Sequence, residues 1–164
     1  MTTLAIQPAL AVRPARIEDL TAILTIENTC FPLGVAFTAR QVRRLLGNPN
    51  AIARVADHQG PRETNLNITG WCVGLVRHAG AHVAGRIYTL AIDPDCQGRG
   101  VGKQLVVHML EELAARDVQR VYLEVRADNT RAVSLYEKLG FTIVRDLSDY
   151  YGEGEHGVSM RRVM

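Results

Sequence analysis

The chain has few cysteines, few aromatic residues and almost no net charge. Its three cysteines, Cys30, Cys72 and Cys96, are scattered and form no C-x-x-C pair. This spacing argues against a disulfide framework and favours a reducing compartment. The formal net charge is +2 at pH 7, which is too small to indicate binding to nucleic acid or to a membrane surface. We therefore expect neither among its partners.

Long apolar runs are also missing. No stretch approaches the ~20 apolar residues that a membrane-spanning helix requires. Residues 1–12 lack the charged start and the long apolar core of a secretory signal. His78 and His82 are four residues apart but straddle a glycine turn, so we expect no metal site. Together these features predict a cytoplasmic protein that needs no metal.

The length and composition of the chain suit one globular domain of ordinary size. The chain has 164 residues, of which 47% are apolar and 22% are charged, and this is enough to form one buried core. We expect residues 1–10 to be a flexible N-terminal extension and residues 11–164 to form the domain.

The spacing of apolar residues predicts a mixed α/β domain. Helical periodicity predicts helices at about 17–30, 38–46, 101–116 and 128–139. Alternation and short apolar runs predict strands at 11–14, 51–56, 70–77, 83–92, 121–126, 141–145 and 158–163. The second, third and fourth strands are expected to form a meander, and residues 58–67 and 149–156 to form polar loops.

The segment L-A-I-D-P-D-C-Q-G-R-G-V-G-K, residues 90–103, carries the strongest local signal. A strand must end before Pro94, because proline cannot donate a hydrogen bond within a sheet. Three glycines alternate directly afterwards, and a helix then begins near Val101. A strand, a glycine loop and a helix start together direct unpaired backbone N–H groups at one point, where an anion such as phosphate binds well.

The spacing of these glycines excludes the two common nucleotide loops. The pattern G-x-x-x-x-G-K-[ST] fails at Gln97 and Gln104, and the pattern G-x-G-x-x-G fails because the loop has G-x-G-x-G. A tight turn alone would explain one or two of the glycines. Three in alternation favour close approach of the backbone to a ligand.

Two residues further along can be interpreted in more than one way. Glu124 lies on the strand face opposite the apolar row of residues 121, 123 and 125, so it is either an ordinary exposed glutamate or a base in a cleft. Tyr136 lies on an apolar helix face, where an aromatic ring usually belongs to the core. The pattern alone slightly favours the structural explanation for both.

At this point the sequence resembles the GCN5-related N-acetyltransferases (GNAT), and among them the ribosomal-protein-alanine N-acetyltransferase (RimI-like) group. The resemblance rests on Q-G-x-G-x-G at residues 97–102 and on Y-L-E-V-R-A-D-N-T-R-A-V-S-L-Y-E-K-L-G-F at residues 122–141. D-Y-Y-G-E-G-E at residues 149–155 and M-R-R at residues 160–162 also match, as does Cys30-Phe31-Pro32 more weakly.

The resemblance implies a fold, a cofactor and a set of site residues. The fold is a single α/β (α+β) GNAT-like domain with a central mixed, mostly antiparallel twisted sheet of six to seven strands, flanked by about four helices. The cofactor is acetyl-CoA, with Glu124 as general base and Tyr136 as the acid that protonates the sulfur. The resemblance assigns cofactor binding to Leu90, Ala91, Ile92, Gln97, Gly98, Arg99, Gly100, Val101, Gly102, Lys103 and Asn129. Tyr150 and Tyr151 are expected to shape the acceptor cleft.

The implied reaction is acetylation of a protein N-terminus, such as that of a ribosomal protein. An α-amine has a pKa of about 8 and a lysine side chain one of about 10.4, so the α-amine loses its proton more easily. A lysine side chain, a small amine or a non-catalytic acyl-CoA-binding module remain alternatives, and the chain could be a monomer or a homodimer. His156, where relatives commonly have aspartate, and residues 58–67 depart from the family pattern.

Overall fold

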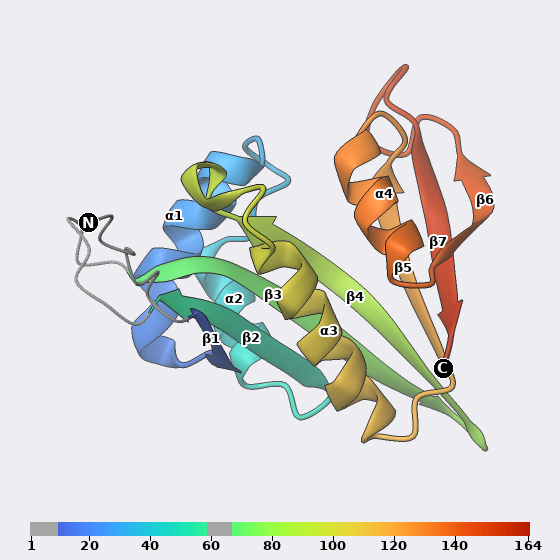
Figure 1. The fold of residues 1–164 in the computed structure, drawn as a ribbon, viewed down its shortest axis with the longest axis horizontal. Coiled ribbons are helices and arrows are strands. Elements are labelled where there is room, and N and C mark those ends of the chain that lie inside the picture. The colour runs from blue at the N-terminus through green and yellow to red at the C-terminus, as the bar shows by residue number, and fades with distance from the viewer. Residues whose placement is uncertain (1–9, 59–66) are drawn as a thin grey trace, which may run out of the picture.

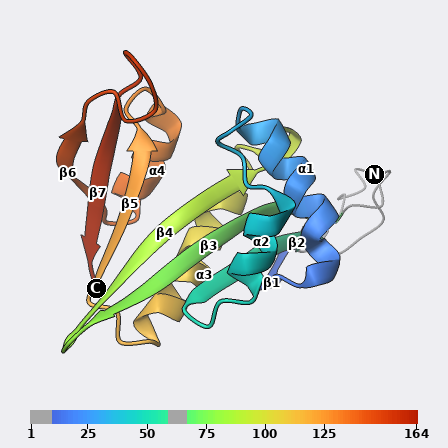
Figure 2. The same ribbon diagram turned by 180° about the vertical axis from the view of Figure 1, so that it is seen from behind.

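The computed structural model describes residues 10–58 and 67–164 (Figure 1; Figure 2). The expected N-terminal extension, except for its last residue, and most of the expected loop 58–67 lie outside these residues. Leu10 itself begins the first strand. None of the described helices is long and apolar enough to cross a membrane.

A seven-stranded sheet forms the centre of the molecule, in the order β1-β2-β3-β4-β5-β7-β6. The strands are β1 (Leu10–Pro14), β2 (Ala51–His58), β3 (Ile68–Ala79), β4 (His82–Ile92), β5 (Arg120–Arg126), β6 (Thr142–Leu147) and β7 (Gly157–Val163). All neighbours are antiparallel except β4 and β5, which are parallel. The expected mixed, mostly antiparallel sheet, with its β2-β3-β4 meander, is therefore confirmed.

Helices cover both faces of this sheet. The α-helices in the described residues are α1 (Leu20–Cys30), α2 (Ala39–Leu46), α3 (Val101–Ala114) and α4 (Thr130–Lys138), and short 3₁₀ turns precede α1 and α3 at Ile17–Asp19 and Pro94–Cys96. Figure 1 shows α3 and α4 on the near face, and Figure 2 shows α1 and α2 on the other. Each face has its own apolar core.

Local sequence explains where these helices begin and which side they bury. Thr38 caps α2, because its side chain accepts a hydrogen bond from Gln41 N while the Gln41 side chain accepts one from Thr38 N. The apolar row predicted for α3 is fully buried and consists of Val101, Leu105, Val106, Met109, Leu110 and Leu113. Burying each such side chain contributes about 1.5–3 kcal/mol, so this row anchors α3 to the sheet.

Most boundaries differ from the predictions by one to three residues, and two of these differences have a structural explanation. The helix expected from residue 17 starts with a 3₁₀ turn, and its α-helical part begins only at Leu20. The strand expected at 141–145 is β6 (Thr142–Leu147), because Phe141 is buried in the core below α4 and does not join the edge strand.

The sheet splits between β4 and β5. The two strands pair only over Ala84–Arg86 and Arg120–Tyr122, and they separate beyond these residues (Figure 1). A bulge in β4 lies at the start of this split: Val73 pairs with Thr89 and Gly74 with Ile87, so Tyr88 has no partner in the register. The bulge turns Ile87 towards the α3 core and Ala91 towards the α1 core. The alternation of residues 83–92 did not predict it.

Candidate active site

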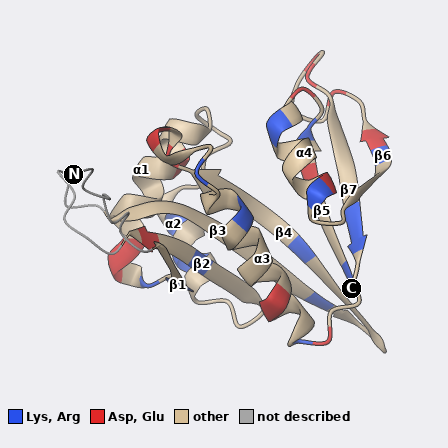
Figure 3. Ribbon diagram, viewed as in Figure 1, with Lys and Arg blue, Asp and Glu red and all other residues tan. Residues whose placement is uncertain are grey.

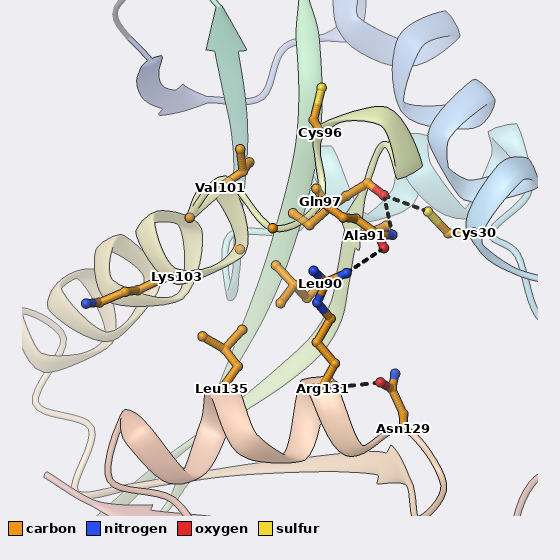
Figure 4. Close-up of a pocket in the computed structure, with 15 residues that line it drawn as sticks. Cys30, Leu90, Ala91, Cys96, Gln97, Val101, Lys103, Asn129, Arg131 and Leu135 are labelled. Carbon is orange, nitrogen blue, oxygen red and sulfur yellow. Dashed lines mark hydrogen bonds between the residues drawn. The ribbon is translucent and has the colours of Figure 1, made fainter.

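A cavity of about 330 Å³ lies beside the split, between the end of β4 and the start of α4 (Figure 4). Its walls come from α1, β4, the glycine loop, the first turn of α3 and the first turns of α4. The lining residues are Cys30, Leu90, Ala91, Ile92, Cys96, Gln97, Gly98, Gly100, Val101, Gly102, Lys103, Asn129, Arg131, Ala132 and Leu135.

The glycine loop presents the start of α3 to this cavity. Gly98 and Gly100 have φ angles of 77° and 80°, a backbone conformation that other residues rarely adopt. Gly100 precedes α3 directly and provides no capping side chain. The first N–H groups of α3 have no partners within the helix, and the positive end of the helix dipole lies at the same place. The loop has the geometry that its sequence predicted, and this geometry suits an anion.

The edge of β4 forms a second polar wall. Asp93 N donates to Thr69 O across the β3–β4 pair at 2.8 Å. Because hydrogen-bonding direction alternates along a strand, the backbone groups of Ala91 point to β3 and those of Leu90 and Ile92 point to the split. An extended ligand can therefore pair with Leu90 and Ile92 as an added strand would.

The carbonyl oxygen of Ile92 already accepts two hydrogen bonds within the protein. Ile92 O accepts hydrogen bonds from Cys30 Sγ at 3.1 Å and from Gln97 Nε2 at 3.2 Å (Figure 4). Partial burial raises the pKa of the Cys30 thiol, which favours the protonated donor form. These bonds tie the end of α1 and the glycine loop to the last residue of β4.

The third wall is the start of α4. Asn129 caps this helix, because its side-chain oxygen accepts a hydrogen bond from Ala132 N at 3.1 Å. Arg131 reaches over the glycine loop, and its Nη1 lies 3.4 Å from Gln97 Oε1. Figure 3 shows basic residues in the first turns of both α3 and α4, so positive charge flanks the cavity from two sides.

The structure gathers most of the predicted cofactor residues in this one cavity. Arg99 is the exception, since it is exposed and does not line the cavity. Five further residues line the cavity that the sequence did not predict as cofactor-binding: Cys30, Cys96, Arg131, Ala132 and Leu135. Arg131 could have been identified from the sequence, because it is a cation two residues after the helix-capping Asn129.

Tyr136 lies on α4 immediately after the cavity-lining Leu135. It is 6% exposed and packs edge-on against Phe141, with the ring centroids 5.7 Å apart. Burial raises the pKa of the Tyr136 phenol, and the Cys72 and Tyr151 side chains raise it further. The phenol is therefore protonated at neutral pH. Tyr136 thus has the core position that its pattern suggested, one residue after a residue that lines the cavity.

Glu124 lies on the other face of the sheet. Val121, Leu123 and Val125 point into the α3 core, so Glu124 points towards the side of α1 and α2, as predicted. Its side chain is 21% exposed and pairs with Arg86 of β4, with Arg86 Nη2 2.7 Å from Glu124 Oε2. Glu124 and the cavity thus lie on opposite sides of the split.

Aromatic side chains lie near Glu124 on this face: Tyr88 contacts the Arg86 that pairs with Glu124, and Tyr151 interacts electrostatically with Glu124. The ring of Tyr88 lies 5.2 Å from that of Phe37, and the rings of Tyr150 and Tyr151 are 5.0 Å apart. Burial raises the pKa of Tyr151 to about 12, with further contributions from the neighbouring Tyr150 and Glu124. These residues form an aromatic surface beside a carboxylate, which suits an amine and the chain that carries it.

A buried glutamate supports this surface from below. Glu27 is 1% exposed and accepts hydrogen bonds from Trp71 Nε1 at 2.8 Å, Thr89 Oγ1 at 3.3 Å and Phe37 N at 3.1 Å. Burial raises the pKa of the Glu27 carboxyl, although these hydrogen bonds oppose the shift. The sequence pattern predicts a helix at Glu27 but no role for its side chain.

His156 takes part in holding the loop that carries the two tyrosines. Its Nδ1 accepts a hydrogen bond from Asp149 N at 3.0 Å, and Asp149 Oδ1 accepts one from Gly154 N at 2.7 Å. Arg126 of β5 bonds Glu155 at 3.2 Å and lies over the ring of Tyr151. The departure from the family pattern at His156 is therefore compatible with an ordered loop. Among the described residues, no group of three or more possible ligands is arranged to hold a metal ion.

Comparison with known proteins identifies relatives of this chain. The sequence model described as "Acetyltransferase (GNAT) family" matches residues 20–141. The [ribosomal protein bS18]-alanine N-acetyltransferase of Escherichia coli K12 is 36% identical over 98 residues, which are 58% of this chain and 66% of that protein. The mycothiol acetyltransferase of Beutenbergia cavernae is 48% identical over 66 residues, 40% of this chain and 22% of that protein. The chain thus spans less than two thirds of either relative.

The fold matches solved structures over almost its whole length. Arabidopsis thaliana NAA60 in complex with acetyl-CoA superimposes with a TM-score of 0.83 at 20% identity, covering 95% of this chain and 99% of that one. This similarity confirms the expected single GNAT-like α/β domain.

Proposed function

This chain belongs to the acetyltransferase (GNAT) family, and on that premise we propose that it transfers the acetyl group of acetyl-CoA to the N-terminal α-amine of a protein, such as a ribosomal protein. The observation that carries the proposal is the split between β4 and β5. An anion-binding cavity lies on one side of it and a carboxylate among aromatic rings lies on the other. An acetyl donor and an amine acceptor that enter from opposite faces of the sheet would meet at the split.

The cavity has the chemistry that acetyl-CoA requires. The start of α3, together with Arg131 and Lys103, offers N–H groups and positive charge to a diphosphate. The backbone groups of Leu90 and the N–H of Ile92 offer strand-like hydrogen bonds to an extended amide chain. The related fold of NAA60 has been solved with acetyl-CoA. Bound in this way, acetyl-CoA supplies an activated acetyl group and a thiolate leaving group.

Glu124 and Tyr136 have complementary roles in this proposal. The ammonium form of the amine must lose a proton before it attacks, and Glu124 accepts that proton directly or through a water molecule. Tyr136 keeps its proton because burial raises its pKa, and it donates that proton to the departing sulfur. The second proton of the attacking nitrogen then replaces the one that Tyr136 has given up. Backbone N–H groups of β4 at the split stabilise the charge that develops on the carbonyl oxygen.

The preference for an α-amine rests on chemistry and on the relatives. An α-amine is about half neutral near pH 8, whereas a lysine amine is almost entirely protonated there. The E. coli relative acts on an alanine of a ribosomal protein. A small amine is the second candidate, because a mycothiol acetyltransferase is also among the relatives.

A peptide panel tests the proposal and its alternatives together. The purified protein is incubated with acetyl-CoA and three acceptors: a peptide with a free N-terminal alanine and an internal lysine, the same peptide with a blocked N-terminus, and a small amine. Mass spectrometry then locates the acetyl group. We expect it on the free α-amine only. Acetylation of the blocked peptide or of the small amine alone would favour the alternatives. Calorimetric binding of acetyl-CoA without any transfer would indicate a non-catalytic module.

A further inference from the structure

Arg86 stands where β4 and β5 separate. It is the last residue of β4 that pairs with β5, opposite Tyr122. Its side chain crosses to Glu124, with Nε 3.0 Å and Nη2 2.7 Å from the same oxygen, Oε2. Neither the apolar pattern nor the family resemblance drew attention to this residue.

The geometry of this ion pair is unusual in one respect. Arginine commonly binds a carboxylate through two parallel bonds, one to each oxygen. Here the Nε–H donates to Oε2 and Nη2 lies 2.7 Å from the same oxygen, so Arg86 leaves the other oxygen of Glu124 unoccupied. A carboxylate held by one oxygen keeps a fixed orientation and still has a lone pair available to a proton donor.

Arg86 is itself held in place. Its guanidinium lies 5.3 Å from the ring centroid of Tyr88, which is close enough for a cation–π contact. The ring of Tyr88 packs against Phe37, whose backbone N–H bonds the buried Glu27. A continuous set of contacts therefore runs from the interior of the domain to the carboxylate.

Stability alone does not account for this arrangement. The side chains of Arg86 and Glu124 are 33% and 21% exposed, and partly exposed ion pairs contribute little to stability. The effect of positioning on the reaction rate is much larger, since misplacing a reacting group by about 1 Å can lower a rate about 10²-fold.

We propose that Arg86 is a positioning residue of the acetyl transfer: it binds one oxygen of Glu124 and thereby presents the other to the acceptor amine. This inference depends on the proposed function, because it requires Glu124 to act as the base. Arg86 does not line the cavity, so its effect should be confined to the acceptor half of the reaction.

Steady-state kinetics of Arg86→Ala and Arg86→Lys test this role. We expect Arg86→Ala to lower kcat by about 10- to 100-fold, with the dissociation constant of acetyl-CoA and the melting temperature unchanged. Lysine offers one charged donor in place of two, so Arg86→Lys should recover part of kcat. Added guanidinium, below the concentration that unfolds the protein, should partly rescue Arg86→Ala. The control is Arg145→Ala, on the exposed edge strand β6, which should match the wild type.

A double variant with Glu124→Gln shows whether Arg86 acts through Glu124. If it does, Arg86→Ala should lower kcat only slightly further in the Glu124→Gln background, because both substitutions remove the same function. Independent, multiplying losses would overturn the proposal, as would an unchanged kcat in Arg86→Ala or a fully active Glu124→Gln. A wild type that acetylates no amine would overturn the proposed function as well, whereas an active wild type with an equally active Arg86→Ala overturns only the role of Arg86.

Discussion

Gly98 and Arg131 meet across the mouth of the cavity: a Cβ atom on Gly98 would lie 2.9 Å from Arg131 Nη2. Glycine therefore has two functions at this position. It permits a φ of 77°, and it leaves room for the guanidinium to close over the loop. The contact links the glycine loop to α4, although the two segments are separated by the whole of α3 and β5.

Replacing Gly98 with alanine should weaken acetyl-CoA binding. Gly80, in the turn between β3 and β4, is a matched control because it also has a positive φ, of 59°, but no atom lies within 4 Å of its added Cβ. Each substitution should cost about 1–2 kcal/mol of stability from backbone strain. Only Gly98→Ala should also raise the dissociation constant of acetyl-CoA measured by calorimetry, by about tenfold for a loss of 1.4 kcal/mol. Equal affinities for the two variants would contradict the assignment of the loop.

Removing the charge of Arg131 should also weaken binding, in a salt-dependent way. A charge-assisted bond to phosphate is worth about 1.5–3 kcal/mol, so Arg131→Ala should bind acetyl-CoA about 10-fold more weakly at low salt. The difference from the wild type should shrink as ionic strength rises. Lys138→Ala, at the opposite end of α4, is the control and should leave affinity unchanged. A loss that does not respond to salt would argue against a direct contact with the anion.

Glu124→Gln should separate chemistry from cofactor binding. The amide keeps the size of the side chain but cannot act as a base, so kcat should fall by about 10²- to 10⁴-fold. The affinity for acetyl-CoA should stay the same, because Glu124 lies across the sheet from the cavity. Glu137→Gln on the exposed side of α4 serves as control. Rapid-quench or steady-state assays that find full turnover in Glu124→Gln would remove Glu124 from the mechanism.

Tyr136→Phe should lower kcat without unfolding the protein. Phenylalanine preserves the packing against Phe141, so the stability change should be about 1 kcal/mol. Because burial raises the pKa of Tyr136 above its ordinary value of 10.0, the wild type should keep this proton donor up to at least pH 9. A fall in wild-type kcat between pH 7 and 9 that disappears in Tyr136→Phe would contradict this account.

The buried Glu27 should make stability depend on pH. Its folded-state pKa is raised above the ordinary 4.5 by burial, so the folded protein binds a proton more readily than the unfolded chain. The free energy of unfolding should therefore increase as the pH falls through the raised value, and level off below about 4.5. Urea unfolding of the wild type and of Glu27→Gln between pH 7 and pH 4.5 measures this. The wild type should gain stability relative to the variant, and a loss would contradict the direction of the shift.

Much of the fold could be predicted because its signals are local. The capping Thr38, the apolar row of α3 and the alternation around Glu124 each depend on residues within a few positions, and each has the predicted role in the structure. The glycine loop was also recognisable, because positive φ angles and an uncapped helix start follow directly from the glycines.

The parts that could not be predicted depend on contacts between distant segments. The bulge at Tyr88 arises from the register of β3 against β4, which no pattern within residues 83–92 reveals. The pair of Arg86 with Glu124 spans 38 positions, and the bond from Cys30 to Ile92 spans 62. Glu27 looked like one more helix residue, because its partners Trp71 and Thr89 come from strands far along the chain.

The most direct test of the central claim is mass spectrometry of a peptide with a free N-terminal alanine after incubation with the protein and isotopically labelled acetyl-CoA. The account predicts one labelled acetyl group on the α-amine, formed by the wild type at a rate that Glu124→Gln lowers by about 10²-fold or more. A peptide that gains no label, while calorimetry shows that acetyl-CoA is bound, would contradict it.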